Sequence, residues 1–395
     1  MFLKQLSLVN YRNYSRLELE CHPGINVFHG DNAQGKSNLI EAIYYLGMGK
    51  AYRTGNDDSL VRWGEESFRI KAELVKSNQL LLEEIGFSFT QRKAIKVNGQ
   101  KVNSFRSLPA LFPLVLFSPD DLQLIKGNPV FRRTYLDEIL GVLYPGFQEA
   151  NSGYRRALTQ RNNLLRRAGG PGDEELEPWE RLLSEQGGRI IAYRLYLLPM
   201  LGNSIRGFFS EISSGGDPLE VNYYSSIPSI WQTSLSASCT IEYYLGEVAK
   251  TIEDYLAAAY VNQRGMDRKR GLTSLGPHRD DLVFRLKGKE VKHYASQGQQ
   301  RAATLALRLA QLKLLDEGLR ERPILLLDDV FSELDENHRD SLLKNLSLER
   351  QVFITTTSTD QIPNWEAIRG GAHCWRVREG RLNPEDPVLD RESYG

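Results

Sequence analysis

A stretch of eight residues near the N-terminus constrains the fold of this chain more than any other feature. It runs from Gly30 to Ser37, reads GDNAQGKS, and matches the pattern G-x-x-x-x-G-K-[ST] in full. The apolar run 25–29 before it predicts a strand, and periodic apolar residues after it predict a helix over 36–46. A loop in this setting can surround phosphate oxygens with backbone N–H groups at the start of a helix. We therefore expect an α/β sheet with a nucleotide site at its edge.

The expected roles within this loop follow from the chemistry of its members. Lys36 is expected to reach the β- and γ-phosphates of ATP, and the Ser37 hydroxyl to ligate Mg²⁺. A chance glycine-rich turn is the alternative, and the strand and helix on either side argue against it. The residues expected to bind the nucleotide are Gly30, Asp31, Asn32, Ala33, Gln34, Gly35, Lys36 and Ser37.

A second part of the same site is predicted where two acids follow an apolar strand. The run 324–327 is Ile-Leu-Leu-Leu, and Asp328 and Asp329 come directly after it. Asp328 is expected to hold Mg²⁺ through water, and Asp329 to position or deprotonate the attacking water. The alternative is a buried strand that ends in two solvated acids, and the phosphate loop elsewhere in the chain counts against it.

The spacing of the two parts indicates the class of phosphate-loop protein. Nearly 300 residues separate Lys36 from Asp328, more than a small GTPase or simple kinase needs, and the sequence has no guanine-reading N-K-x-D pattern. Before the acidic strand, Ser296, Gly298 and Gln299 lie in a small-residue turn that opens an apolar helix. A serine and a glycine at the start of a helix can form a second anion site.

Together these motifs are similar to those of the ABC-type ATPases. Residues 296–300, Ser-Gln-Gly-Gln-Gln, resemble their signature motif, and residues 331–335, Phe-Ser-Glu-Leu-Asp, resemble their D-loop. Within that class the chain resembles the RecF family of bacterial recombination mediators, from residue 1 to about 380. The further matching strings are Asn10-Tyr11-Arg12-Asn13-Tyr14, Tyr52-Arg53-Thr54, Phe117-Ser118-Pro119-Asp120-Asp121-Leu122, Arg132-Arg133 with Leu136-Asp137, and Gly276-Pro277-His278-Arg279-Asp280-Asp281-Leu282.

The resemblance implies a fold and an activity. The implied fold is α/β, an ABC-type P-loop ATPase head with an antiparallel β subdomain and an inserted, mainly helical second lobe. The implied activity is a weak Mg²⁺-dependent ATPase coupled to DNA binding and to an ATP-dependent homodimer. The residues implied to act in catalysis are Lys36, Asp328, Asp329, Ser296 and Gln299, with Ser296 and Gly298 also contacting the nucleotide, and Ser37 and Asp328 serving the metal.

The resemblance also implies partners. The dimer is expected to clamp duplex DNA near single-strand gaps or junctions, and RecR and RecO are the implied protein partners. The processes implied are recombination, DNA repair, replication and the SOS response.

Two positions depart from the pattern of most ABC-type ATPases. Asp329 stands where most have a glutamate, one methylene longer, so slow hydrolysis is expected. Threonines at 355–357 occupy the strand that carries a switch histidine in many of them, and the sequence leaves open which one faces the site.

Asp120, Asp121 and Gln123 are candidates for a magnesium-facing or water-facing side chain, although the same acids suit a helix start.

Two further residues have alternative roles. Arg12 is expected either to contact adenine or phosphate, or to pin the first hairpin. His278 is either a site residue or a structural one, with a local ion pair between Arg279 and Asp280 as the simplest arrangement beside it.

Charge bears on the DNA prediction. The chain has 50 Lys and Arg against 50 Asp and Glu, so it does not coat nucleic acid through net charge. Two local clusters suit phosphate contacts, and a solvated helix face is the alternative for each. The first consists of Arg155, Arg156, Arg161, Arg166 and Arg167, and the second of Arg264, Arg268, Lys269 and Arg270 around Asp267.

Other features indicate the compartment. Cys21, Cys239 and Cys374 are far apart, which suits a reducing environment. No apolar run approaches the roughly 20 residues that cross a bilayer, and the N-terminus does not resemble a signal peptide. We therefore expect a cytoplasmic protein with no membrane partner.

The patterns divide the chain into four segments. They are an N-terminal part of the head with the phosphate loop and β subdomain (1–128), an inserted helical lobe (129–270), a C-terminal part of the head with the signature segment and acidic strand (271–380), and a polar tail (381–395).

Two other functions are kept as alternatives. A P-loop kinase or phosphotransferase would act as a monomer on a small acceptor, and the signature-like segment at Ser296 argues against it. A soluble ABC-type assembly ATPase with a protein partner would share the ATP motifs but would not bind DNA.

Overall fold

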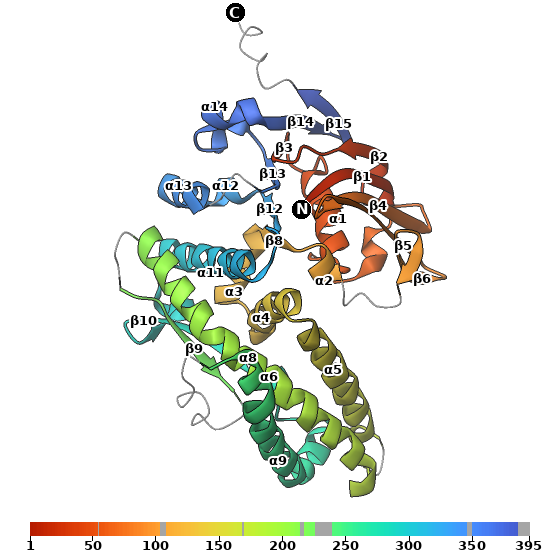
Figure 1. Ribbon diagram of the computed structural model, residues 1–395, viewed down its shortest axis with the longest axis vertical. Coiled ribbons are helices and arrows are strands. Elements are labelled where there is room, and N and C mark those ends of the chain that lie inside the picture. Colours follow the sequence, from red (N-terminus) through yellow and green to blue (C-terminus); the bar gives the residue numbers. More distant parts are fainter. Residues whose placement is uncertain are drawn as a thin grey trace, which may run out of the picture. The chain divides into compact units, whose positions relative to one another are not determined.

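The computed structural model describes residues 1–53, 55–102, 108–167, 170–213, 217–225, 239–345 and 350–385. The chain divides into two compact units, one formed by residues 1–121 with 304–395 and the other by residues 122–303 (Figure 1). The second unit extends beyond the helical lobe predicted over 129–270, because the strand Glu220–Tyr224 pairs with the strand Asp281–Leu286 within it.

An antiparallel sheet contributes one side of the first unit, and its strand order is β2-β1-β4-β5-β6-β7. Apolar residues alternate with polar ones along it, so one face is buried and the other is exposed. Asn98 and Gly99, with φ of 49° and 78°, form the type I′ turn predicted between β6 and β7. The strands are β1 (Phe2–Tyr11), β2 (Tyr14–Glu20), β4 (Ser67–Lys76), β5 (Gln79–Ser88), β6 (Arg92–Val97) and β7 (Gln100–Val102).

A second sheet of the same unit has the order β15-β14-β3-β13-β12-β8. All its neighbouring strands run parallel except β14 and β15, which are antiparallel. Parallel strands end at the same edge of a sheet, so the loop after β3 and the acids after β12 meet at one edge. The strands are β3 (Ile25–His29), β8 (Leu114–Phe117), β12 (Ile324–Asp328), β13 (Val352–Thr356), β14 (Ala372–Arg378) and β15 (Arg381–Glu385).

Helix α1 (Lys36–Met48) packs between the sheets of this unit (Figure 1). Leu39, Ile40 and Ile43 are completely buried and share one core with apolar residues of both sheets. The other helices of the unit are α2 (Leu108–Leu111), α12 (Val330–Glu333), α13 (Glu336–Asn345) and α14 (Trp365–Ile368), while α11 (Gln297–Gly318) begins in the second unit and ends in the first.

The sequence patterns did not predict the two C-terminal strands, β14 and β15. The prediction of a polar tail over 381–395 is wrong for Arg381–Glu385, which forms β15 along the edge of β14. Trp375 lies opposite Pro384, and Val377 lies opposite Leu382. A strand at a sheet edge tolerates a proline and a polar outer face, so its composition resembles that of a loop. The rest of the predicted tail lies outside the described residues.

The second unit is mainly helical and contains a small antiparallel sheet of order β11-β10-β9. Asn128 caps α4 by accepting a hydrogen bond from the Val130 N–H, with Pro129 as the first helical residue, as the sequence predicts. Its helices are α3 (Gln123–Lys126), α4 (Pro129–Leu143), α5 (Pro145–Leu165), α6 (Asp173–Ile212), α8 (Ile241–Tyr243), α9 (Ala249–Arg270) and α10 (Val291–Tyr294), and its strands are β9 (Glu220–Tyr224), β10 (Asp281–Leu286) and β11 (Lys289–Glu290).

A buried ionic cluster joins the three long helices of this unit. Arg161 of α5 is completely buried, and its guanidinium donates to Glu180 of α6 at 2.9 Å and to Asp267 of α9 at 2.7 Å. The charges compensate one another, and removing either acid would leave Arg161 buried with too little negative charge around it. Arg161 therefore fixes how α5, α6 and α9 pack within this unit.

Candidate functional site

The phosphate loop between β3 and α1 depends on backbone conformations that favour glycine. Gly30 and Gly35 have φ of 141° and 114°, and Ala33 lies in the left-handed region at 66°. A Cβ atom on Gly30 would come within 2.6 Å of the Val377 carbonyl oxygen, and one on Gly35 would come within 2.4 Å of the Asn13 side chain. Any larger residue at these two positions would displace the loop from its surroundings.

Two hairpin turns hold the loop from outside. From the β1–β2 turn, the Asn13 side chain donates to the Gln34 carbonyl at 3.0 Å and the Tyr14 hydroxyl donates to the Gly35 carbonyl at 3.1 Å. From the β14–β15 turn, the Gly380 N–H donates to the same Gln34 carbonyl at 3.0 Å. The loop therefore keeps its curvature through contacts with fixed elements, which is the preorganisation that a phosphate cradle needs.

Lys36 begins α1 and is folded back over the loop. Its ammonium group donates to the carbonyl oxygens of Gly30 at 2.6 Å and Asp31 at 2.8 Å. Burial lowers the pKa of Lys36, and the carboxylates of Asp329, Asp31 and Asp328 oppose that shift. The cation is therefore held near the acids that follow β12.

Asp328 ends β12, is almost completely buried, and has a donor on each carboxylate oxygen. The Thr355 hydroxyl donates to Oδ1 at 2.9 Å. The Tyr52 hydroxyl and the Arg53 guanidinium donate to Oδ2 at 2.5 Å and 3.0 Å. Burial and the Asp328 charge raise the pKa of Tyr52, so its hydroxyl keeps its proton and acts as a donor.

Asp329 follows in the left-handed backbone conformation, with φ of 52°. Its N–H donates to the Thr355 carbonyl at 3.2 Å and to the Thr355 hydroxyl at 3.0 Å. Its Oδ1 atom is buried and has no hydrogen-bond partner in the part of the chain that the structure describes. Burial raises the pKa of this carboxyl group, so it accepts a proton more readily than an exposed aspartate.

The donor set at this edge fits a hard divalent cation. Mg²⁺ prefers oxygen ligands and keeps several waters, so it is held by few protein groups. The Ser37 hydroxyl follows Lys36 in α1, and the Asp328 carboxylate lies among three donors that water molecules of a hydrated ion could replace. The unpartnered Asp329 oxygen adds an acceptor for a bound water.

The signature-like segment forms a capping box at the start of α11. The Ser296 N–H donates to the Gln299 side chain at 3.0 Å, and the Gln299 N–H donates to the Ser296 hydroxyl at 3.2 Å. Ser296, Gly298 and Gln299 are all exposed. This segment lies in the second unit, whereas the phosphate loop and the acidic pair lie in the first.

Comparisons with known proteins identify the family of this chain. The family model for the RecF/RecN/SMC N terminal domain matches residues 2–373. A "DNA replication and repair protein RecF" from Bacillus cereus (strain B4264) is 39% identical over 395 residues, covering 99% of this chain and all of that protein. The chain belongs to the RecF family.

Solved structures support the same assignment. The recombination mediator protein RecF-ATP in the RecFOR pathway is 34% identical, with a TM-score of 0.85, and the match covers 97% of each chain. An Smc head domain with an extended coiled coil from Pyrococcus furiosus is 14% identical with a TM-score of 0.53, which shows a shared fold. The fold is thus the ABC-type ATPase head of RecF and SMC proteins, with an antiparallel sheet and a helical lobe.

Two of the RecF-like positions in this chain, Arg12 and Asp121, have structural partners. Arg12 forms a bidentate pair with the buried Glu41 of α1, at 2.8 and 3.1 Å, so it pins the first hairpin. Asp121 accepts from the Ser118 N–H at 2.9 Å and from Arg308 at 2.5 Å, as expected of a helix-start acid with a cation beside it.

His278 lies inside the second unit of this RecF-family chain. Its Nδ1 lies 2.6 Å from the Tyr154 hydroxyl and its Nε2 lies 3.1 Å from the Thr273 carbonyl oxygen. Burial lowers its pKa to about 4, so the imidazole is neutral near pH 7. The predicted ion pair between Arg279 and Asp280 does not form. Arg279 donates a hydrogen bond to the Thr273 carbonyl, and the Asp280 carboxylate accepts hydrogen bonds from Arg194 and Tyr223.

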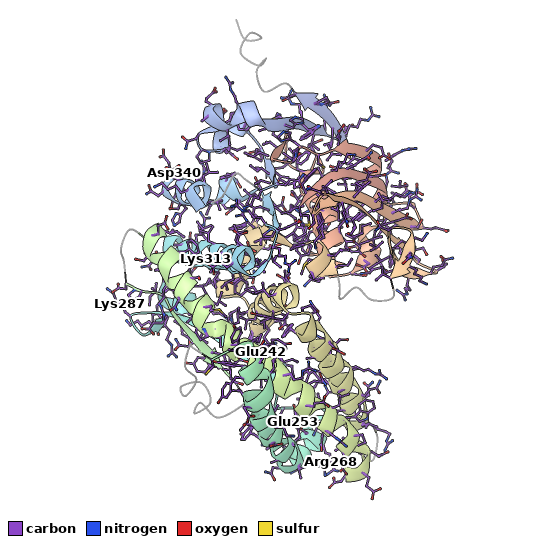
Figure 2. All side chains as sticks on the ribbon, in the orientation of Figure 1. Glu242, Glu253, Arg268, Lys287, Lys313 and Asp340 are labelled. Atoms are coloured by element: carbon purple, nitrogen blue, oxygen red, sulfur yellow. The ribbon has the colours of Figure 1, made fainter. Side chains whose placement is uncertain are left out.

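The two arginine clusters are largely neutralised by acids from other helices. Arg161, Arg264 and Arg268 contact Glu180, Asp267 or Asp173, and Figure 2 marks Arg268 near the end of α9. Arg167 pairs with Glu175 at 2.5 Å, and Arg155 lies 3.3 Å from Asp137. The exposed cations of these clusters that have no acidic partner among the described residues are Arg156, Arg166, Lys269 and Arg270.

Sequence reasoning assigned no role to Tyr52, Arg53 or Asn13. All three belong to short sequences that resemble RecF, and this resemblance was the only indication that they act in the site. Their hydrogen-bond partners lie far away in the sequence. Asp328 is 276 residues from Tyr52, and its contact with that hydroxyl depends on the position of β12 beside α1.

Among the described residues, no helix is both long and apolar enough to span a lipid bilayer.

Proposed function

We propose that this chain binds ATP with Mg²⁺ in the loop 30–37, hydrolyses it slowly, and acts in recombinational DNA repair. The observation that carries the proposal is the arrangement at one sheet edge. There, a preorganised phosphate loop with Lys36 stands near the two acids that follow β12, and the Asp329 Oδ1 atom has no hydrogen-bond partner within the described residues. The ATP complex of a RecF 34% identical to this chain supports the nucleotide.

Each group in this site has a distinct role in the proposed reaction. Backbone N–H groups of the loop and Lys36 bind the β- and γ-phosphates and offset the charge that develops on them. Ser37 and Asp328 would hold the metal, and Mg²⁺ would supply charge neutralisation for the phosphate oxygens when bound. Asp329 orients the attacking water and accepts its proton, a role that its raised pKa favours. An aspartate reaches less far than a glutamate, so turnover is slow.

The signature-like segment supports an ATP-dependent homodimer. Ser296, Gly298 and Gln299 are exposed at the start of a 22-residue helix, where backbone N–H groups favour an anion. We place them against the γ-phosphate of ATP bound to a second copy of the chain. Two ATP molecules would then lie between two heads, and hydrolysis would separate them.

The proposed macromolecular ligand is duplex DNA near single-strand gaps or junctions. The named relatives are a DNA replication and repair protein and a recombination mediator of the RecFOR pathway, which supports DNA, RecO and RecR as partners. We place these interactions in the cytoplasm. In the second unit, Arg156, Arg166, Lys269 and Arg270 are exposed cations available for phosphate contacts.

Sedimentation velocity with and without ATP tests the proposed dimer. Wild-type protein is expected to shift from monomer to dimer on adding ATP and Mg²⁺. Lys36→Met is expected to lose ATP binding and stay monomeric, whereas Ser296→Arg is expected to bind ATP but stay monomeric. Thr159→Arg changes another exposed hydroxyl residue of the second unit and is expected to dimerise normally. ATP-dependent dimerisation of Ser296→Arg would refute the dimer model.

A further inference from the structure

The exposed face of the antiparallel sheet carries an excess of positive charge that the nucleotide site does not use. We call this surface the outer face; it is opposite the face that packs on α1. Its basic residues outnumber its acidic ones by seven to four, although the whole chain has equal numbers of each. The basic residues are Lys4, Arg16, Arg69, Lys71, Arg92, Lys96 and Lys101, and the acidic residues are Glu18, Glu20, Glu73 and Glu84.

Strand register places some of these residues in a row that contains no acid. Arg16 of β2 lies opposite Val9 of β1, and Val9 lies opposite Arg69 of β4. The row continues through Gly86 of β5 to Ala94 of β6. The small side chains of Gly86 and Ala94 leave the β5–β6 end of the row low beside the long Arg69 side chain.

Three of the four acids of the outer face form ion pairs with neighbouring cations. Glu84 lies 3.8 Å from Lys71, Glu18 lies 3.8 Å from Arg16, and Glu73 lies 3.7 Å from Lys4. The remaining acid, Glu20, is at the end of β2, the edge strand. An ordinary solvated sheet face would pair opposite charges across its strands. Here four cations form no ion pair among the described residues, although Lys96 lies opposite Glu84 in the strand register. They are Arg69, Arg92, Lys96 and Lys101.

Two adjoining hollows lie on this face. One has a volume of about 720 Å³ and is lined by four cations and four acids, the buried Glu83 among the acids. The cations are Arg16, Arg69, Lys71 and Lys96, and the acids are Glu18, Glu73, Glu83 and Glu84. The second has a volume of about 750 Å³ and is lined by Arg69, Arg92 and Lys101 among others. Val9 and Arg69 line both hollows, so the two form one basic groove along the outer face.

We propose that this groove binds the phosphate backbone of duplex DNA without sequence preference. Unpaired cations spread over several strands suit a row of phosphates, since each neutralised phosphate releases a counterion. Adjacent strands lie about 4.8 Å apart, so Arg69 and Lys96, two strands apart, are spaced by about 10 Å or more. That spacing allows them to contact different phosphates.

The composition of the groove favours a duplex over single-stranded DNA. Single strands bind best where aromatic side chains stack on unpaired bases. The aromatic residues that line the groove are Phe68 and Phe87, and both are buried in the core of the unit, so neither ring is exposed for stacking on a base. An apolar protein partner would need several large exposed apolar side chains, and among the described lining residues of the groove only Leu82 is one.

The inference rests on the proposed DNA binding and assigns it a surface in the first unit. The test measures binding of a fluorescein-labelled duplex by fluorescence anisotropy at several salt concentrations, with and without ATP. The variant is Arg69→Gln with Lys96→Gln, and the control is Arg320→Gln, another exposed cation of the first unit. The side chains of Arg69 and Lys96 make no hydrogen bond within the described residues, so the variant should retain its unfolding temperature and ATP binding.

The double variant is expected to bind the duplex at least about tenfold more weakly, with the slope of log affinity against log salt reduced in magnitude by about 1 to 2. The Arg320→Gln control is expected to match wild type. Unchanged affinity and slope in the double variant would overturn the groove while leaving DNA binding intact. Failure of wild-type protein to bind DNA in either nucleotide condition would instead refute the proposed function.

Discussion

The Tyr52 hydroxyl donates a 2.5 Å hydrogen bond to Oδ2 of Asp328, the acid that ends β12. Arg53 donates to the same oxygen at 3.0 Å, and the ring of Tyr52 packs edge-on against Tyr44 of α1. The segment after α1 that contains Tyr52 and Arg53 therefore contacts Asp328, the proposed ligand of the hydrated Mg²⁺, directly. A water of the proposed magnesium ion would therefore compete with the Tyr52 hydroxyl for this carboxylate oxygen.

Removing that hydroxyl should ease metal binding. Tyr52→Phe is expected to lower the Mg²⁺ concentration for half-maximal ATP hydrolysis about three- to tenfold, because it removes one charge-assisted hydrogen bond. Hydrolysis measured across a Mg²⁺ titration gives this value. Tyr243→Phe removes an exposed tyrosine hydroxyl of the second unit, which has no part in the phosphate loop or the Asp328 network, and is the matched control. A Mg²⁺ requirement for Tyr52→Phe equal to or above that of wild type would contradict the competition.

Thr355 and Thr356 offer a matched pair of substitutions. The Thr355 hydroxyl donates to Asp328 Oδ1 and receives the Asp329 N–H, while the Thr356 hydroxyl donates to the Ser358 carbonyl. Both are completely buried, so either change to valine is expected to lower the free energy of unfolding by about 1–3 kcal/mol. Only Thr355→Val is expected to slow hydrolysis as well, by about tenfold or more. Equal hydrolysis by the two variants in a steady-state assay would show that Thr355 does not support the acids.

Asp329 should be required for hydrolysis and dispensable for ATP binding. Asp329→Asn is expected to reduce the single-turnover rate by about 100-fold or more while ATP affinity changes little. Asp120→Asn, at an exposed acid that was a rival candidate from the sequence, should hydrolyse ATP at the wild-type rate. If Asp329→Asn keeps most of its activity, another group activates the water.

The pH dependence of hydrolysis follows from the same carboxyl group. Burial raises the pKa of Asp329, and only its charged form can accept a proton. The rate is therefore expected to fall as the pH drops through this raised pKa, beginning at a higher pH than an exposed aspartate would give. A pH–rate profile of single-turnover hydrolysis measures where the rate begins to fall. A fall centred at the pKa of an ordinary aspartate would contradict the proposed role of Asp329.

Glu83 of β5 predicts a pH dependence of stability. Its carboxyl group is buried, both oxygens have no hydrogen-bond partner among the described residues, and burial raises its pKa to about 8. The folded state therefore keeps a proton that the unfolded state loses near pH 4.5, so stability falls as the pH rises from about 4.5 to about 8.

Glu83→Gln removes this titration. Its gain in unfolding free energy over wild type is expected to be near zero at pH 4.5 and on the order of 1–3 kcal/mol at pH 8. Urea denaturation at both values measures the difference. Glu84→Gln changes the next residue, on the outer face, and should show no such pH trend. A constant offset between Glu83→Gln and wild type would rule out a titrating Glu83.

Features contained in contiguous residues were predictable from the sequence. The phosphate loop, the acidic strand and the turn at Asn98 and Gly99 each depend on a few neighbouring residues. Alternation along a strand shows that Thr355 and Thr356 face opposite sides, but only the register of β13 with β12 shows that Thr355 lies beside Asp328. Register depends on tertiary packing, so the sequence alone left the choice open.

Charge was the least predictable property. The sequence shows a run of arginines in α5, but it does not show that Glu180 of α6 and Asp267 of α9 surround Arg161. Nor does it show that Arg69 and Lys96, 27 residues apart, face the same hollow. Helix packing hides charges that appear exposed in the sequence, and sheet register gathers charges that appear scattered.

The most direct test of the account is the affinity of the wild-type protein for gapped duplex DNA with and without ATP. An ATP-gated dimer predicts that ATP and Mg²⁺ raise affinity about tenfold or more, that Lys36→Met abolishes the increase, and that affinity falls with added salt in both nucleotide states. Equal affinity with and without ATP, or no binding to DNA at all, would contradict the claim that this chain is a nucleotide-gated DNA clamp.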